Sequence, residues 1–336
     1  MITQTAIFLV SAAVVAIVGT RLAEAADRLA DRTGLGEALM GALFLGASTS
    51  LPGITASVTA AVDGRPVLAL SNALGGIAAQ TAFIAIADIA YRKANLEHAA
   101  ASVPNMMQGA LLVVLLSMLL LGSLSPDVSV GGVHLLTPLL FVVYVMGMRV
   151  VYQSQAEPMW RPRWTTQTQL DQPEGKNLNE TRVANLWATF TATAIIVVAA
   201  GWALTRAAGR LADGIGFSDT IAGGLLTAIS TSLPELVTSV AAVRRGALTL
   251  AVGGVIGGNA FDTLFAAVAD IAYRPGSIYH AASDKELALV TLTILMTAVL
   301  LMGLLRREKS GFANIGFEGV FVLLLYFAGM AMLATT

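Results

Sequence analysis

The chain has 336 residues, of which 56% are hydrophobic and 12% are charged. A soluble domain carries about 25% charged residues, so this composition excludes an ordinary soluble protein. There is no cysteine, which excludes disulfides and thiolate metal sites. A net charge of −1 argues against a nucleic-acid partner. We therefore expect an integral membrane protein whose partners are membrane lipid and small solutes.

Apolar segments recur along the whole chain, and about 20 mostly apolar residues suffice for a helix to cross a bilayer. The predicted spans, in chain order, are 3–20, 35–62, 66–91, 105–124, 131–151, 186–205, 217–244, 247–273, 285–305 and 315–334. Five spans precede the polar segment 152–185 and five follow it. The fold class predicted is an all-α membrane protein with ten transmembrane helices.

The two halves of the chain are copies of one unit. A shift of 182 residues places 19–100 on 201–282 without a gap, and 37 of the 82 aligned positions are identical. Matches come in blocks, such as Ser48–Pro52 with Ser230–Pro234, which apolar composition alone would not produce in register. We predict a first repeat at 1–151 with its motif at 46–83, a linker at 152–185, and a second repeat at 186–336 with its motif at 228–265.

An odd number of spans in each copy forces the second copy to enter the membrane upside down. Inverted repeats of this kind are typical of transporters, with the substrate site near the bilayer midplane between the repeats. Basic residues set the orientation: with the N-terminus outside, loops on the inside hold 15 of the 20 Lys and Arg residues. Both termini are therefore predicted outside and the linker in the cytoplasm, most simply at a prokaryotic inner (plasma) membrane.

Each repeat carries hydroxyl residues followed by a proline within an apolar span. Proline removes one backbone hydrogen bond and disturbs the carbonyl four residues earlier. Freed carbonyls and the hydroxyls of Thr49, Ser50, Thr231 and Ser232 would suit Na⁺ or Ca²⁺, which prefer oxygen ligands. The alternative is that these small residues only allow helices to pack closely.

Glu235 favours the ion-binding interpretation. It follows Pro234 in a span with no other acid from Ala222 to Val243, and a charge at mid-helix costs roughly 2.5–3.5 kcal/mol. On the next span, Asn259 and Asp262 are three residues apart and share a helix face. Glycines 253, 254, 257 and 258 just before them would allow close approach of another helix.

These motifs resemble those of the cation/calcium exchanger superfamily. Thr231–Glu235 together with Gly257–Asp262 is similar to that family's second repeat, and Thr49–Gly53 is similar to its first. The resemblance covers nearly the whole chain and implies a sodium/calcium exchanger-like antiporter with a degenerate first repeat. Carried over residue by residue, it implies an ion site formed by Glu235, Asp262, Thr231, Ser232, Thr49, Ser50 and Gln80, to which the shared helix face adds Asn259.

The first repeat departs from the family pattern. Gly53 stands where the family has glutamate, and Gln80 stands where the motif ends in asparagine. One carboxylate of the site is therefore missing. Two carboxylates can still neutralise Ca²⁺, whose affinity depends on the number of charged ligands.

Other polar residues point to structural roles. Asp88 and Asp270 precede Arg92 and Arg274 by four residues, which predicts ion pairs within a helix. The three histidines, His98, His134 and His280, show no cluster in the sequence, so we predict no zinc site. Trp160 and Trp164 in the linker could lie at the lipid headgroups or in a solvated segment.

We find no nucleophile–base set, phosphate loop or dinucleotide fingerprint, and predict a protein that is not an enzyme and needs no cofactor. The main functional prediction is secondary antiport of Ca²⁺ for Na⁺. A cation/proton exchanger with altered selectivity and a non-transporting membrane scaffold are the alternatives.

Overall fold

The computed structural model describes residues 2–33, 36–91, 93–156, 160, 162–163, 165–168, 183–215, 219–311 and 315–335. Among these residues, nine helices are long and apolar enough to cross a membrane. The bent pair Leu225–Thr231 and Leu233–Arg245 brings the number to ten. The predicted class, an all-α membrane protein with ten spans, is thereby confirmed. Trp164 and Arg92 lie outside the described residues.

The two halves run through the same series of elements. The first contains α1 (Ile2–Thr33), α2 (Glu37–Leu39), the π-helix η1 (Met40–Gly46), α3 (Ala47–Val62), α4 (Pro66–Ala90), α5 (Leu96–Ala99), α6 (Val103–Leu124), β1 (Ser129–Val130), β2 (Val133–His134) and α7 (Leu136–Ala156). The second contains α8 (Val183–Ile215), α9 (Asp219–Ile221), the π-helix η2 (Ala222–Thr227), α10 (Ala228–Thr231), α11 (Leu233–Arg245), α12 (Leu248–Ala272), α13 (Asp284–Arg306) and α14 (Phe317–Thr335).

Two predicted boundaries are wrong for identifiable reasons. α1 extends to Thr33 rather than ending near residue 20, because Leu22, Ala26 and Leu29 continue a buried face on the polar segment. The fifth span begins at Leu136 rather than at 131. The preceding residues form an antiparallel hairpin, β1–β2, whose turn requires positive φ and uses two consecutive glycines at 131 and 132.

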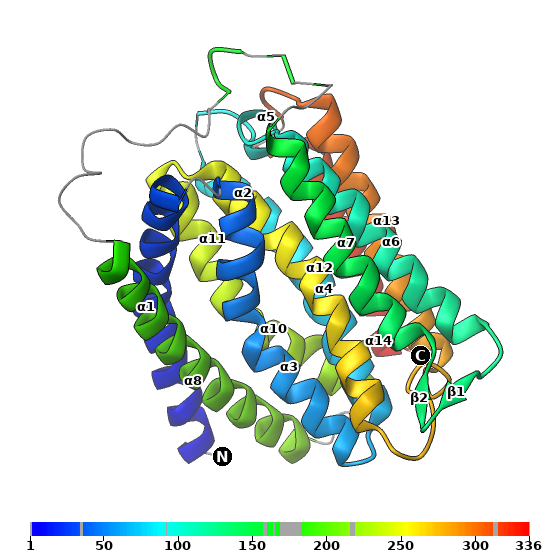
Figure 1. Ribbon diagram of the computed structural model, residues 1–336. Helices are drawn as coiled ribbons and strands as arrows, with labels where there is room; N and C mark the ends of the chain where they lie inside the picture. The colour runs from blue at the N-terminus through cyan, green and yellow to red at the C-terminus, as the bar shows by residue number, and fades with distance from the viewer. Residues whose placement is uncertain are drawn as a thin grey trace.

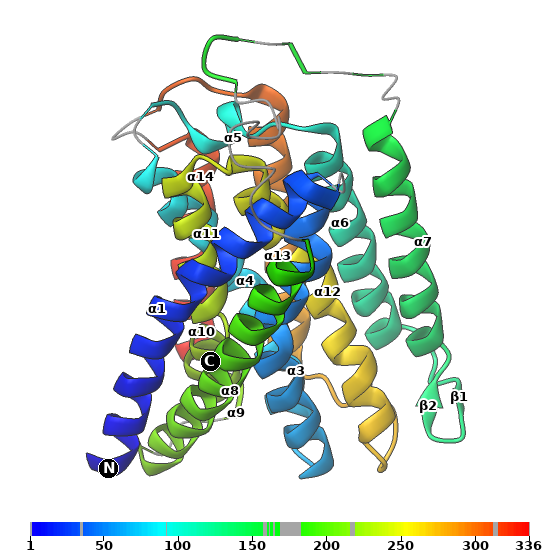
Figure 2. The same ribbon diagram turned by 60° about the vertical axis from the view of Figure 1, so that its left-hand side comes forward.

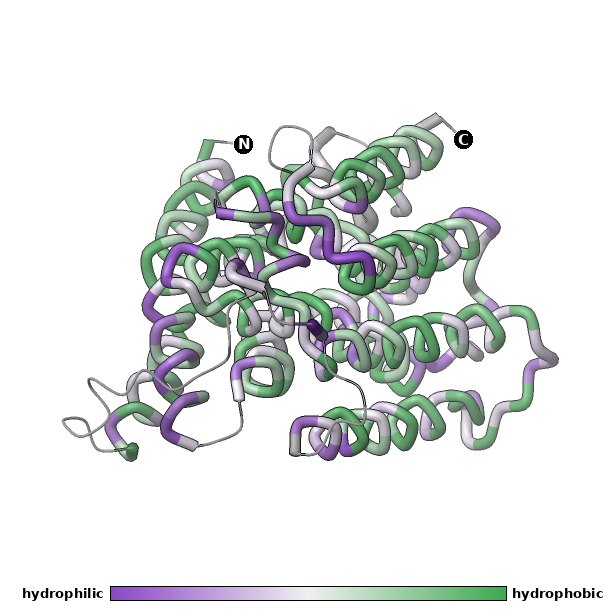
Figure 3. The backbone as a smooth tube through the Cα atoms, turned by 90° about the horizontal axis from the view of Figure 1, so that it is seen from above, coloured by the Kyte–Doolittle hydropathy of each residue, from purple (hydrophilic) through white to green (hydrophobic). Residues whose placement is uncertain are grey.

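α4 and α12 form the centre of the bundle (Figure 1). In their most apolar windows 83% and 89% of the residues are buried inside the protein, against 28% for α1 and 33% for α8. A helix that is apolar all round and buried on every side belongs in a core. α1 and α8 pack against each other at the periphery, where they cross in the view of Figure 1 and run side by side in Figure 2. Seen from above, hydrophobic residues dominate the helices (Figure 3).

Glycines bring η1 and α12 into contact backbone to backbone. A Cβ at Gly41 would lie 2.6 Å from the Leu250 carbonyl oxygen, and one at Gly257 would lie 2.1 Å from the Ala42 Cβ. No larger residue fits these positions without moving a helix. The prediction that the glycines of 253–258 allow close approach is confirmed, and the contact holds α12 beside the hydroxyl–proline motif of the first repeat.

Two aspartates at matching positions anchor the loops after α4 and α12. The Asp88 carboxylate accepts hydrogen bonds from the backbone N–H groups of Leu96 and Gly316 at 2.6 and 3.1 Å. The Asp270 carboxylate accepts from the N–H groups of Ile278 and His134 at 3.0 and 2.9 Å.

Asp270 also accepts a hydrogen bond from the Thr137 hydroxyl at 2.6 Å. The predicted helix ion pair of Asp270 with Arg274 is therefore wrong, since the carboxylate is fully used by loop and helix-start donors instead. For Asp88 the predicted partner lies outside the described residues. Both aspartates act as anchors between the third span of one repeat, α4 or α12, and the start of the last span of the other, α14 or α7.

Candidate ion-binding site

The same hydroxyl–proline motif gives two different backbones. In the first repeat α3 continues through Pro52 as an unbroken helix, preceded by η1. In the second repeat the chain breaks at Ser232, whose φ and ψ are −91° and 0°, and α10 and α11 meet at 43°. Pro234 then lies in the first turn of α11, where proline is well tolerated. The sequence prediction of a helix disturbed at the proline holds for the second repeat alone.

The break places Glu235 in the first turn of α11. Its side chain is 3% exposed, and a carboxylate near a helix N-terminus is favoured by the helix dipole. The Ser50 hydroxyl on α3 donates a hydrogen bond to Glu235 Oε1 at 3.1 Å, while Oε2 has no hydrogen-bond partner. Ser50 and Thr49 of the first repeat thus lie beside the acid of the second.

Asp262 on α12 is the second carboxylate of the site. Its Oδ2 accepts a hydrogen bond from the Gln80 amide on α4 at 2.7 Å, and the same amide donates to the Ser232 hydroxyl at 3.2 Å. Gln80 therefore joins the break in the second repeat to α12. Within the described part of the chain, neither carboxylate forms an ion pair with lysine or arginine.

Four buried side-chain oxygens of the predicted residues have no hydrogen-bond donor. They are Glu235 Oε2, Asp262 Oδ1, Gln80 Oε1 and Asn259 Oδ1. A buried oxygen acceptor without a donor is costly unless another group satisfies it. A cation with oxygen ligands would do so, because Na⁺ and Ca²⁺ are bound by carboxylate and amide oxygens.

The predicted hydroxyls are oriented by their own helices. Thr49 donates to the carbonyls of Leu45 and Gly46, each at 3.0 Å, and Thr231 donates to Ala228 at 3.0 Å. A hydroxyl that donates to a carbonyl keeps its lone pairs free to meet a cation. Asn259 is tied elsewhere, because its amide donates to Thr81 on α4 at 3.0 Å. Among the described residues, no hydrogen bond joins Asn259 to Glu235 or to Asp262.

Phe265 fills the place of the missing carboxylate, which sequence reasoning did not find. A Cβ at Gly53 would lie 2.6 Å from Cε2 of the Phe265 ring. Phe265 is 3% exposed and packs edge-on against Phe261, with ring centroids 6.3 Å apart. The exchange of glutamate for glycine therefore leaves an apolar wall rather than a cavity. This contact could not be predicted, because phenylalanine stands at the matching position 83 of the first repeat as well and so does not mark Phe265 as special.

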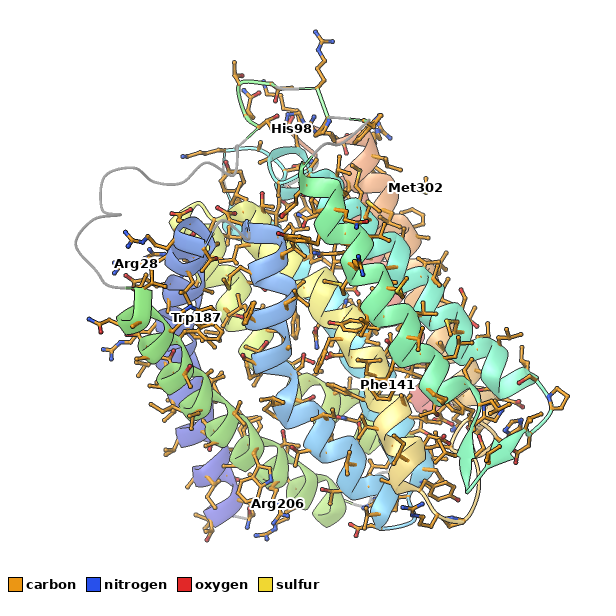
Figure 4. All side chains as sticks on the ribbon, in the orientation of Figure 1. Arg28, His98, Phe141, Trp187, Arg206 and Met302 are labelled. Carbon is orange, nitrogen blue, oxygen red and sulfur yellow. The ribbon has the colours of Figure 1, made fainter. Side chains whose placement is uncertain are left out.

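A cavity of about 170 Å³ lies between α3, α4 and α8. Its lining includes Asp63, Arg65 and Arg206, which lie near one end of the helix bundle. The lining also includes Pro52 and Asn72, which lie deeper between the helices. Figure 4 shows Arg206 at the end opposite His98. The Asn72 amide donates to the Gly53 carbonyl at 3.1 Å, so the cavity reaches the backbone of the first-repeat motif.

The family described as "Sodium/calcium exchanger protein" matches residues 3–148 and 185–335, which together are most of the chain. The chain belongs to the sodium/calcium exchanger family. Its relatives include the inner membrane protein YrbG of Escherichia coli, 27% identical over 304 residues that cover 89% of each chain. The sodium/calcium exchanger MaX1 of Methanosarcina acetivorans is 34% identical over 122 residues, 36% of this chain and 33% of that one.

Solved structures of an exchanger share the fold. The sodium-calcium exchanger NCX_Mj soaked with 10 mM Na⁺ and 10 mM Sr²⁺ superposes with a TM-score of 0.73 at 18% identity, over 98% of both chains. The same exchanger soaked with 10 mM Na⁺ and no Ca²⁺ gives a TM-score of 0.71. This likeness establishes the exchanger fold with its inverted five-helix repeats. Members of the family are membrane exchangers rather than enzymes in the usual sense.

Proposed function

We propose that this antiporter exchanges Ca²⁺ for Na⁺ by alternating access, with Glu235 and Asp262 as the charged ligands. Membership of the exchanger family supports antiport, and a relative named as a sodium/calcium exchanger supports the ions. Ser50 on α3 and Gln80 on α4 position the two carboxylates by donating hydrogen bonds to Glu235 and Asp262, and the Gln80 amide also donates to Ser232 at the helix break. Thr49 and Thr231 add hydroxyl oxygens, and Asn259 supports α12 from the side of α4.

The proposal rests above all on two buried carboxylates without a counter-ion. Glu235 and Asp262 are 3% and 1% exposed, and each keeps one oxygen without a donor. Two like charges cannot remain buried and unpaired, because an isolated buried ion costs several kcal/mol or more. The pair carries a formal charge of −2, which one Ca²⁺ neutralises in one half-cycle and two Na⁺ neutralise in the other.

Cation/proton exchange is the second candidate, and the wall formed by Phe265 favours it. With the third carboxylate replaced by an aromatic ring, protons on Glu235 and Asp262 would suffice to neutralise the site when the metal ion leaves. Ser50 and Gln80 are neutral donors and supply no positive charge. Under this candidate, uptake depends on the proton gradient and is indifferent to Na⁺.

We place both termini outside and the linker in the cytoplasm of a prokaryotic inner membrane. The support is the distribution of basic residues, 15 against 5, between the two sets of loops. In Figure 4, Arg28 lies near the linker end with His98, and Arg206 lies at the opposite end, which agrees with their predicted sides. In this orientation the cavity beside Arg206 opens to the outside and α1 and α8 are the helices that slide.

The test measures ⁴⁵Ca²⁺ uptake into proteoliposomes loaded first with Na⁺ and then with acid. Glu235→Gln keeps the size of the side chain and removes its charge, so uptake should fall by at least about 100-fold, as for loss of a buried charged ligand worth about 3 kcal/mol or more. Asp284→Asn, an exposed acid at the start of α13, is the matched control and should transport like the wild type.

Three outcomes separate the candidates. Na⁺-driven uptake that is lost in Glu235→Gln supports sodium/calcium exchange. Uptake driven by acid but not by Na⁺ overturns sodium/calcium exchange and supports cation/proton exchange. Absence of uptake of any cation by correctly folded wild type would overturn antiport and leave a scaffold role.

A further inference from the structure

Three side chains that the transport site does not use meet at the end of the molecule opposite the linker. Asp127 precedes β1, His134 ends β2, and His280 lies between α12 and α13. One ligand atom from each lies within 4.8 Å of the others, and the two imidazole centroids are 5.4 Å apart. The sequence prediction that no histidines form a cluster is therefore wrong. The residues are 146 positions apart, so the sequence could not show it.

His280 is oriented as a metal ligand would be. Its Nε2 donates to the Ser125 carbonyl at 2.7 Å, which leaves the Nδ1 lone pair free. Metal-binding histidines usually donate their second ring N–H to an acceptor of this kind. His98, the matching residue of the first repeat, has both ring nitrogens in hydrogen bonds, with the Arg307 carbonyl at 2.6 Å and the Thr165 hydroxyl at 2.8 Å. His98 is therefore a structural residue and His280 is not.

His134 supplies an independent observation that points to a ligand. The side chain is 4% exposed, and its Nε2 is buried without any hydrogen-bond partner. Its Nδ1 accepts a hydrogen bond from the Leu136 N–H at 3.2 Å. Binding through Nε2 moves the ring proton to Nδ1 and forfeits this long bond.

We propose that Asp127, His134 and His280 bind one zinc-class divalent ion. Two imidazoles and a carboxylate with an open fourth position suit Zn²⁺, whereas Ca²⁺ and Na⁺ prefer all-oxygen sites. Its nitrogen ligands would make this site select a zinc-class ion over the transported Ca²⁺ and Na⁺. It would also clamp the hairpin of the first repeat to the α12–α13 loop of the second, beside the anchor Asp270. Its expected effect is thermal stabilisation.

The test uses full-length protein carrying no polyhistidine tag and stripped with chelator. Zinc is titrated by calorimetry in excess Ca²⁺ and Na⁺, and the cobalt-loaded protein is examined by visible absorption. The expected result is one ion per chain, with a cobalt spectrum typical of nitrogen and oxygen ligands and a rise in Tm on adding zinc. His280→Ala and Asp127→Asn change exposed residues, so both variants should fold.

Each variant should lose at least about 10-fold in zinc affinity, since loss of even an outer-shell partner commonly costs 10–100-fold. Asp284→Asn, an exposed acid four residues after His280, is the control and should bind like the wild type. Equal zinc binding by wild type and His280→Ala would overturn the proposal, as would no binding by wild type. Neither zinc-binding result bears on ⁴⁵Ca²⁺ uptake, so the zinc site and the proposed exchange are tested independently.

Discussion

The two repeats share the residues Ser-Thr-Ser-Leu-Pro and use them differently. In the second repeat the chain breaks at Ser232 and presents Glu235 to Ser50 of the first. In the first repeat α3 runs straight through Pro52, and Phe265 of the second repeat covers Gly53. Each repeat therefore completes the motif of the other, one with a hydroxyl and one with an aromatic ring. A duplicated motif indicates where a site lies, but the opposite repeat decides what that motif does.

The surroundings of the two anchor aspartates, Asp88 and Asp270, also differ between the repeats. Around Asp270 the partners are neutral, since Thr137 donates to it and also bonds to Tyr279 at 2.9 Å. Around Asp88, Glu97 stands at the position of Tyr279 and Glu318 at that of Leu136. Both glutamates are buried, at 1% and 0% exposed. The first-repeat anchor is thus a cluster of three acids where the second-repeat anchor has one.

The largest expected effect comes from Gly53→Glu, which restores the family carboxylate to the first repeat. Overpacking against Phe265 costs about 1–3 kcal/mol and burying a further charge costs more, so we expect poor folding and no gain of transport. The double variant Gly53→Glu with Phe265→Ala opens the space and should regain stability and lower the KM for Ca²⁺. The measurements are Tm and ⁴⁵Ca²⁺ uptake. A single variant that folds and gains transport would disprove the role given to Phe265.

Gly201→Ala should destabilise the folded protein by a smaller amount than Gly53→Glu. A Cβ at Gly201 on α8 would lie 2.6 Å from the rigid ring of Pro52, whereas one at Gly209 on the same helix meets nothing within 4 Å. Alanine gains about 1 kcal/mol of helix propensity at either position, so the contact must outweigh this at Gly201. Denaturation should show a lower Tm for Gly201→Ala and an equal or higher one for Gly209→Ala. The same sign at both positions would contradict the close packing of α8 on Pro52.

The smallest expected effect concerns pH and Glu97. Burial, then the negative charges of Asp88 and Glu318, raise the pKa of Glu97 well above its ordinary value of 4.5. The folded state therefore keeps a proton that the unfolded state loses, so stability is greatest at low pH and falls as pH rises above 4.5. In Glu97→Gln the slope of Tm against pH should be flatter. A slope unchanged from wild type would show that Glu97 is not the titrating group.

The sequence predicted the spans and most of the site because membrane composition and a duplicated motif are local signals. Glu235, Asp262, Gln80 and Ser50 could be grouped before any geometry was known, since each matches a motif position. The features that the sequence did not predict were contacts between distant segments. Phe265 against Gly53, His134 beside His280, and Asp270 with Thr137 join residues far apart in the chain, and a single sequence carries no signal for them.

The ring of Phe265 over Gly53 also bears on how this exchanger can change over evolutionary time. A mutation to glutamate at position 53 is harmful while the aromatic ring remains, and loss of the ring is harmful while position 53 is glycine, because it leaves a void. Neither single step is favoured, although the pair together would be tolerated. Gly53 and Phe265 are therefore coupled, and the cost of either single change holds both residues in place over evolutionary time.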